Sequence, residues 1–210
     1  MRTHWLPAFA LLAGLAGCIG DSPTAPAKAK PIALRAPTSP ENLIFNLEAV
    51  YNDRVRQPEE RLAAFQDLFA PDLAFIVPPA DLGRGLPASW GLETEVAIHR
   101  RMFEAQARRE IRSLALVLAH PPAAQLDPPQ EGRDDWKEVF VPMVALRLLW
   151  NAADGLDATG GQCRFLAEPR AGRWYIREWI ELQRPRGRGG APSLSVDGST
   201  WAWIKARFLP

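Results

Sequence analysis

The chain has 210 residues, 47% of them hydrophobic, and its 25 basic and 24 acidic side chains leave a formal charge of +1. This length and composition suit a single domain with a sizeable core. A chain so close to neutrality lacks the basic footprint that bulk nucleic-acid binding requires, so we expect no nucleic-acid partner.

The N-terminus has the parts of an export signal. Residues 1–4 carry positive charge, and the run from Trp5 to Ala16 is uncharged and almost wholly apolar. This run is shorter than the roughly 20 residues that a membrane-spanning helix needs. Leu15-Ala16-Gly17-Cys18 resembles the signal box of bacterial lipoproteins, which implies a cleaved signal peptide at 1–17 and lipid attachment at Cys18. The alternative is a buried N-terminal helix with an incidental cysteine.

The resemblance to lipoproteins also implies a location. The mature protein would be held by acyl chains in the bacterial cell envelope, with its domain facing the periplasm or the exterior. Ile19 follows the cysteine where aspartate favours retention in the inner membrane, so the outer membrane is the better expectation. Residues 18–39 are rich in proline and poor in large apolar groups, which predicts an extended tether between the membrane and the domain.

The first half of the domain reads as helices around one short strand. Ser39 can cap a helix at 40–56, because proline and glutamate follow it and apolar residues recur at helical spacing. Pro58 opens a second helix that ends near Ala70. The run 73–77 predicts a strand, a polar loop continues to about Gly91, and 93–109 is again helical.

The second half reads as strands. Residues 111–119 and 136–150 predict two of them, and Pro142 indicates a bulge in the second because proline lacks a backbone donor. Residues 151–161 read as a turn, and 162–168 and 173–183 as a hairpin in which Gly172 can take positive φ. Ser199 or Thr200 can cap a final short helix. Helices followed by a mainly antiparallel sheet predict an α+β fold, with the curved sheet wrapped around the long helix at 93–109 as a cone.

Three segments resemble the nuclear transport factor 2-like superfamily, which has a cystatin-like fold, and are closest to its SnoaL-like and ketosteroid isomerase-like members. They are SPENLIFNLEAVYNDR, FQDLFAPDLAFIV and GRWYIREWIE. The resemblance covers about 40–184, and 185–210 adds a basic loop and the final helix. Because one fold carries many functions, it leaves isomerases, dehydratases and non-catalytic binding or assembly domains open.

His99 is the first candidate for chemistry, because it shares a helix face with Val96 and Phe103. In the resembled fold this helix faces the cavity, where an imidazole could act as a general base or bind a ligand. The alternative is a hydrogen-bonded histidine at the edge of the core.

The last strand supplies two further candidates, Glu178 and Tyr175, since ketosteroid isomerase-like enzymes use a carboxylate and a tyrosine. Strict alternation would place Tyr175 and Trp179 on one face and Glu178 on the other, among apolar residues that would raise its pKa. The alternative for Glu178 is a salt bridge to Arg147 or Arg164.

The aromatic residues could line an apolar ligand cavity or form plain core. The candidate cavity residues are Trp90, His99, Phe103, Trp150, Tyr175 and Trp179. No spacing of histidine and cysteine fits a metal site, and no phosphate loop is present, so we expect no metal and no cofactor.

The sequence therefore predicts a lipid-anchored envelope protein with a non-catalytic domain that binds a small apolar ligand or a protein. One alternative is an enzyme of the isomerase or dehydratase type, with Glu178 or His99 as the base. The other is an assembly subunit that forms a homodimer through its sheet.

Overall fold

The computed structural model describes residues 29–119, 126–127, 133–152, 154–182 and 200–210. The predicted signal peptide, Cys18 and most of the basic loop lie outside these residues. In chain order the elements are α1 (Pro40–Asn52), α2 (Pro58–Gln66), β1 (Phe69–Ile76), α3 (Pro79–Leu82), β2 (Ser89–Gly91), α4 (Leu92–Ala107), β3 (Ser113–Leu118), β4 (Leu126–Asp127), β5 (Lys137–Leu149), β6 (Gly155–Arg170), β7 (Arg173–Leu182) and α5 (Trp201–Ala206). None of the helices in these ranges is long and apolar enough to cross a membrane.

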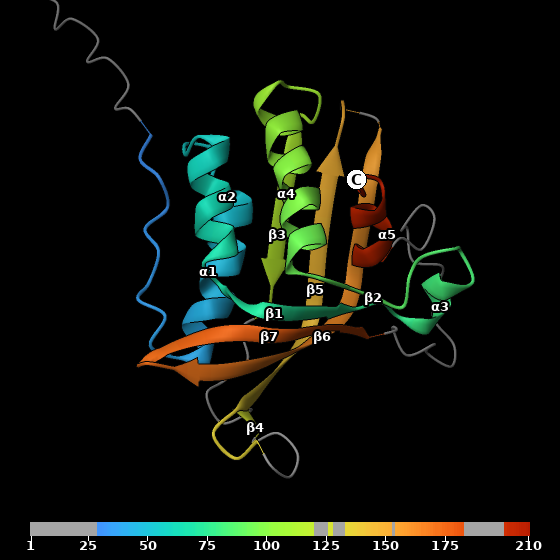
Figure 1. Cartoon of the computed structure of the whole chain (residues 1–210). Coiled ribbons are helices and arrows are strands. Elements are labelled where there is room, and N and C mark those ends of the chain that lie inside the picture. Colours follow the sequence, from blue (N-terminus) through green and yellow to red (C-terminus); the bar gives the residue numbers. More distant parts are fainter. Residues whose placement is uncertain (1–28, 120–125, 128–132, 153, 183–199) are drawn as a thin grey trace, which may run out of the picture.

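One curved sheet carries the helices on its inner side, as Figure 1 shows. Its strand order is β2-β1-β7-β6-β5-β3, and β4 pairs with β5. The pairs are antiparallel except β1 with β7, which run parallel. The predicted α+β class and the curved sheet around the long helix α4 are confirmed, with this parallel pair as an addition.

Local chemistry sets the ends of α1. The Ser39 hydroxyl accepts a hydrogen bond from the Asn42 amide at 3.4 Å, and Pro40 occupies the first turn. The helix ends at Asn52, earlier than predicted. The reason is that Asp53 takes an extended conformation and accepts the amides of Val55 and Arg56 at 2.8 and 3.0 Å.

The bulge predicted at Pro142 is present, because the register of β5 against β6 shifts between Val141 and Val144. The turn predicted at 151–161 is shorter than expected. It closes with the Asp154 amide on the Asn151 side chain at 2.8 Å, and β6 begins at Gly155. Here Leu146 and Ala158 pair across the sheet and are both buried, so the ladder continues to the end of β5.

A second bulge lies in β7 and overturns the predicted faces of this strand. Leu166 pairs with Glu178 but the next residue, Ala167, pairs with Ile176, so Arg177 is an extra residue. Ile176 and Trp179 are therefore both fully buried. Glu178 is directed away from the core, contrary to the prediction that it interrupts an apolar face.

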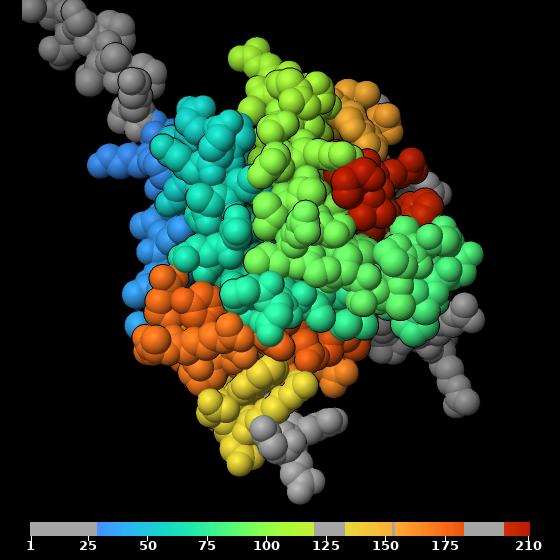
Figure 2. All heavy atoms as spheres, in the orientation of Figure 1, coloured from blue at the N-terminus to red at the C-terminus, as the bar shows by residue number. Residues whose placement is uncertain are grey.

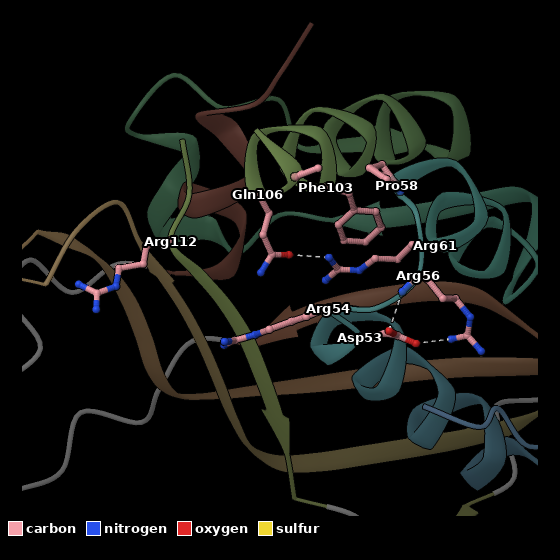
Figure 3. Close-up of a pocket in the computed structure, with 9 residues that line it drawn as sticks. Asp53, Arg54, Arg56, Pro58, Arg61, Phe103, Gln106 and Arg112 are labelled. Atoms are coloured by element: carbon pink, nitrogen blue, oxygen red, sulfur yellow. Dashed lines mark hydrogen bonds and ion pairs between the residues drawn. The ribbon is translucent and has the colours of Figure 1, made fainter. Parts of the chain in front are cut away.

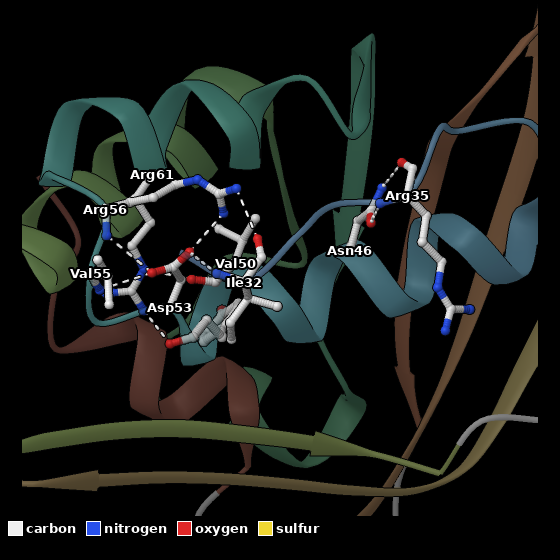
Figure 4. A network of polar contacts seen from close by, with 9 residues as sticks. Ile32, Arg35, Asn46, Val50, Asp53, Val55, Arg56 and Arg61 are labelled. Carbon is white, nitrogen blue, oxygen red and sulfur yellow. Dashed lines mark hydrogen bonds and ion pairs between the residues drawn. The ribbon is translucent and has the colours of Figure 1, made fainter. Parts of the chain in front are cut away.

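The packed domain begins before residue 40, so the predicted tether is too long at its C-terminal end. Arg35 and Asn46 exchange two hydrogen bonds of 2.8 Å, and the Trp174 amide donates to the carbonyl of Pro37 at 2.8 Å. The Ile32 amide donates to Asp53 at 3.0 Å, so this segment follows α1 along its length (Figure 4). A packed N-terminal strap from about Ile32 is part of the fold.

Side chains from the sheet and from every long helix meet in one core. The largest fully buried ones include Trp179 and Phe165 from the sheet and Tyr51, Phe65 and Phe103 from the helices. The C-terminal helix α5 adds Trp201, which is 1% exposed. Figure 2 shows the atoms of α5 lodged between α4 and the segment around α3.

Candidate functional site

A group of polar side chains lies at the centre of the cone, where α1, α4 and α5 meet the sheet. Each is at most 7% exposed, and Tyr51, Glu95, His99 and Lys205 are 0% exposed. We call the group the interior cluster; its members are Tyr51, Trp90, Glu95, His99, Glu181, Trp201 and Lys205.

His99 and Tyr51 form the first part of the cluster. The Nδ1 atom of His99 lies 2.8 Å from the backbone carbonyl of Glu95, which can only accept, so Nδ1 carries the proton. The Nε2 atom is then an acceptor, and the Tyr51 hydroxyl donates to it. The Trp201 indole in turn donates to the Tyr51 oxygen at 3.3 Å, which completes a directed chain of hydrogen bonds.

Glu95 and Lys205 form the second part, a fully buried ion pair. The ammonium of Lys205 donates to Oε1 of Glu95, and the indole of Trp90 donates to Oε2 at 2.5 Å. The ammonium also lies 3.4 Å from the ring centre of Trp179 and 3.9 Å from that of Phe75. The π faces of these rings attract the cation and take the place of water around it.

Glu181 holds the start of α5. Its two carboxylate oxygens accept the backbone amides of Trp201 and Ala202, each at 2.7 Å. Thr200 caps the helix by accepting from the amide of Trp203 at 3.0 Å, as predicted, and its hydroxyl donates to Asp81. The first turn of α5 is thus bound through its otherwise unpaired amides.

Burial controls the protonation of the cluster. It lowers the pKa of His99 well below its usual value, with the Lys205 charge acting in the same direction, and it raises the pKa of Tyr51. Both groups are therefore neutral near pH 7. Burial also raises the pKa of Glu181 to about 7, although the two α5 amides favour its ionised form.

A neutral imidazole hydrogen-bonded to a phenol is chemically able to exchange a proton with it. In this structure, however, the pair is enclosed by aromatic rings. The His99 ring lies 3.8 Å from that of Phe65, and the Trp201 ring lies 4.3 Å from that of Trp179. With Tyr51 and His99 both 0% exposed, a substrate could reach them only after the packing around them opened, for example by movement of α5.

The structure brings together some of the predicted cavity residues and separates others. Trp90 and His99 belong to the interior cluster, and Phe103 and Trp179 pack beside it. Trp150 instead lies at the turn between β5 and β6.

Tyr175 and Glu178 lie away from the cluster. Tyr175 lines an open groove of about 600 Å³ between α2 and the β6–β7 hairpin, together with Phe69 and Arg170. Glu178 forms an ion pair of 3.0 Å with Arg133, a different arginine from those predicted.

Several members of the cluster were missed by the sequence analysis. Glu95 precedes His99 by one helical turn, and Tyr51 ends the apolar stripe of α1, so the spacing of both residues indicates that they face the core. Nothing in the sequence indicates that Lys205 is buried, because a lysine in a short terminal helix is usually exposed. Within the described ranges, no group of three or more histidine, cysteine, aspartate or glutamate residues is placed to hold a metal ion.

No protein-family model and no curated protein matches the chain. Among solved structures, a proposed scytalone dehydratase from Novosphingobium aromaticivorans is 12% identical with a TM-score of 0.48, covering 71% of this chain and 92% of that one. A proposed aromatic ring hydroxylase from the same organism is 17% identical with a TM-score of 0.47, covering 67% and 83%. An NTF2-like protein of unknown function from Shewanella oneidensis is 13% identical with a TM-score of 0.41, covering 67% and 93%. The last of these neighbours is described as the kind of protein that the motifs of this chain resemble.

Proposed function

We propose that this chain is a bacterial envelope lipoprotein whose domain works by self-assembly rather than by catalysis or by holding a ligand inside the cone. The observation that carries the proposal is the closed interior cluster. A ligand there would displace Trp201 and Lys205 and leave Glu95 buried without its cation. Breaking a buried ion pair in this way costs about 3–5 kcal/mol, which a small apolar ligand would first have to offset.

The outer face of the sheet offers a surface for assembly. The two most exposed large apolar side chains among the described residues are Val117 on β3, 49% exposed, and Met143 on β5, 46% exposed. Val117 pairs with Ala145, two residues from Met143, so the two side chains are close neighbours on one face. Neighbouring exposed apolar groups of this kind are typical of interaction sites.

The charges around this patch favour a second copy of the chain as the partner. Arg147 pairs with Asp157 at 2.9 Å, and Arg164 pairs with Glu138 at 3.6 Å, so each of these positive charges has a negative charge beside it. In a two-fold dimer a surface meets its own copy, and a strongly basic or acidic face would repel itself. A face with balanced charges and an apolar centre avoids this repulsion.

The oligomeric state tests the proposal. We expect the full chain in neutral detergent to sediment as a dimer, and Val117→Lys to sediment as a monomer at the same concentration, because the ammonium would enter the interface. Leu82→Lys is the matched control, since Leu82 is 42% exposed on α3 and should leave the dimer intact. A monomeric wild type, or equal loss in both variants, would refute assembly through this face.

The anchor has its own test. With the packed strap beginning near Ile32, the residues after Cys18 could span about 40 Å in an extended polyproline conformation. In cells fed a labelled fatty acid, the wild type should become labelled and fractionate with the envelope membranes. Cys18→Ser should not become labelled, and continued labelling of this variant would contradict the lipoprotein assignment.

The hydrogen bond between Tyr51 and His99 favours a second candidate, an isomerase or dehydratase that acts when α5 is displaced. It would use neutral His99 as the base and Tyr51 as the acid. The test is to return molecules extracted from the host envelope to the purified protein. A shifted double bond or a loss of water with the wild type, absent with His99→Gln, would favour this function over assembly alone.

A further inference from the structure

A small basic pocket of about 200 Å³ lies on the side of the domain where the end of α1, the start of α2 and the end of α4 meet. Its lining includes Arg54, Arg56, Arg61, Arg112, Asp53 and Gln106. Figure 3 shows Arg61 and Gln106 at the centre, Arg54 reaching to one side, and Arg112 beyond it with its guanidinium directed outward. The pocket belongs neither to the interior cluster nor to the outer face of the sheet.

Arg61 is the unusual member, because it is a buried cation whose hydrogen-bond partners are all neutral. It is 3% exposed. Its guanidinium donates to the carbonyls of Val50 and Tyr51 and to the side-chain oxygen of Gln106, the first and last at 2.5 Å. Among the described residues, no carboxylate lies within ion-pair distance of it. A buried charge without a counter-charge is costly, so an anion in the pocket would be favourable here.

Asp53 does not fill this role. It accepts the backbone amides of Ile32, Val55 and Arg56, and it forms a 2.8 Å ion pair with the side chain of Arg56. Burial alone would raise the pKa of Asp53, but these donors outweigh burial and hold the pKa below its usual value. Asp53 therefore forms its ion pair with Arg56, and although its charge favours the charged form of Arg61, it makes no ion pair with that guanidinium.

Arg54 and Arg112 are two further cations at the same pocket. Both are exposed, and Arg54 donates to the hydroxyl of Ser113 at 2.9 Å. Within the part of the chain that the structure describes, neither is ion-paired to a carboxylate. Burial lowers the pKa of Arg61 to about 10, so its guanidinium remains charged at neutral pH.

We propose that this pocket binds a single phosphate group, held by Arg54 at its mouth and facing Arg61 on its floor, with the exposed Arg112 turning its outward guanidinium toward the mouth. Three uncompensated arginines match a dianion better than a single carboxylate, and the planar guanidinium fork suits phosphate oxygens. A volume of about 200 Å³ equals roughly six or seven waters, which is ample room for one phosphate group.

The phosphate could belong to a free phosphate compound or to a lipid headgroup. The carbonyl of Ile32 accepts from Arg56 at 2.9 Å, so the N-terminal strap enters the domain beside this pocket. If Cys18 is lipidated, the pocket lies at the end of the domain to which the anchor leads. This position places membrane phosphate among the sources that the experiment has to distinguish.

Calorimetric titration of the full chain with inorganic phosphate, at constant ionic strength against chloride, tests the site. We expect saturable binding that weakens about tenfold or more in Arg54→Gln and in Arg112→Gln, since one charge-assisted contact is lost in each. Arg147→Gln is the matched control, because Arg147 is also exposed but lies on the sheet, and it should bind phosphate as the wild type does.

A second arm separates the sources. Cys18→Ser protein of mature length, residues 18–210, which carries neither the signal peptide nor the acyl chains, is mixed with vesicles of phosphatidylcholine with or without phosphatidic acid. Binding that needs phosphatidic acid and is lost in Arg54→Gln assigns a lipid headgroup, while binding of free phosphate alone assigns a soluble ligand. The proposal is overturned if neither probe binds, or if Arg147→Gln weakens binding as much as Arg54→Gln does.

Discussion

Replacing Lys205 by methionine tests the interior cluster most sharply. The ammonium neutralises Glu95 and lies over the rings of Trp179 and Phe75, at a position that is 0% exposed. Methionine has a similar length and can fill the same space, so the substitution removes the charge without opening a large cavity. What remains among the described residues is a buried carboxylate that accepts from the Trp90 indole and lies 3.6 Å from Nδ1 of His99, which is neutral near pH 7.

The expected loss follows from this unpaired charge. Removing one partner of a buried ion pair costs about 3–5 kcal/mol, a large share of the roughly 5–15 kcal/mol that stabilises a typical domain. The double variant Glu95→Gln with Lys205→Met removes both charges, and it should recover most of the loss. The coupling free energy between the two positions should therefore be at least about 2 kcal/mol.

Urea unfolding followed by tryptophan fluorescence measures these free energies. Arg207→Met is the control, because Arg207 caps the C-terminal end of α5 and is exposed. This substitution should change the free energy of unfolding by less than about 0.5 kcal/mol. If Lys205→Met were as mild as this control, or if the double variant were no more stable than Lys205→Met, the buried pair would not hold α5 in place.

Three further predictions follow from the same structure. The pKa of Glu181 is raised from 4.5 to about 7, so the stability that this group contributes is fully present below pH 4.5 and is lost as the pH rises through 7. The lowered pKa of His99 acts in the opposite direction, because stability falls as the pH falls below 6.5, where the imidazole takes up a proton in the unfolded chain. The two effects offset each other in the wild type, and Glu181→Gln should therefore lose about 1.4 kcal/mol more stability per pH unit than the wild type between pH 6.5 and 4.5; parallel unfolding curves against pH would contradict this. Cys163 is 1% exposed and burial raises its pKa, so in Cys18→Ser protein its thiol should react with Ellman's reagent only on unfolding, and rapid reaction of the native protein would show an open strand. Gly172 has a φ of +80° with open space around it, so Gly172→Ala should cost about 1 kcal/mol in thermal unfolding, and no loss would place this turn in another conformation.

The sequence predicted those parts of the fold that depend on neighbouring residues. The start of α1 at Ser39, the cap of α5 at Thr200 and the turn at Gly172 each depend on the chemistry of one or two side chains. The bulge at Pro142 follows in the same way from a missing backbone donor.

Features that depend on distant partners could not be predicted in this way. The extra residue Arg177 in β7 is fixed by pairing with β6 and β1, and nothing in the local pattern distinguishes it. Tyr51 and His99 are 48 positions apart and meet only because α1 and α4 lie against the same sheet. Lys205 is buried because Glu95 and two aromatic rings surround it, and such burial leaves no trace in the sequence of a short helix.

Native mass spectrometry of the lipidated protein purified in mild detergent tests most directly whether α5 closes the cone. We predict the mass of two chains, each with its proposed acyl chains, and no further molecule apart from one that carries the phosphate proposed for the basic pocket, because Trp201 and Lys205 already occupy the centre of each domain. A stoichiometric apolar molecule without a phosphate group, released from each chain, with the amides of α5 exchanging rapidly with solvent, would contradict this conclusion.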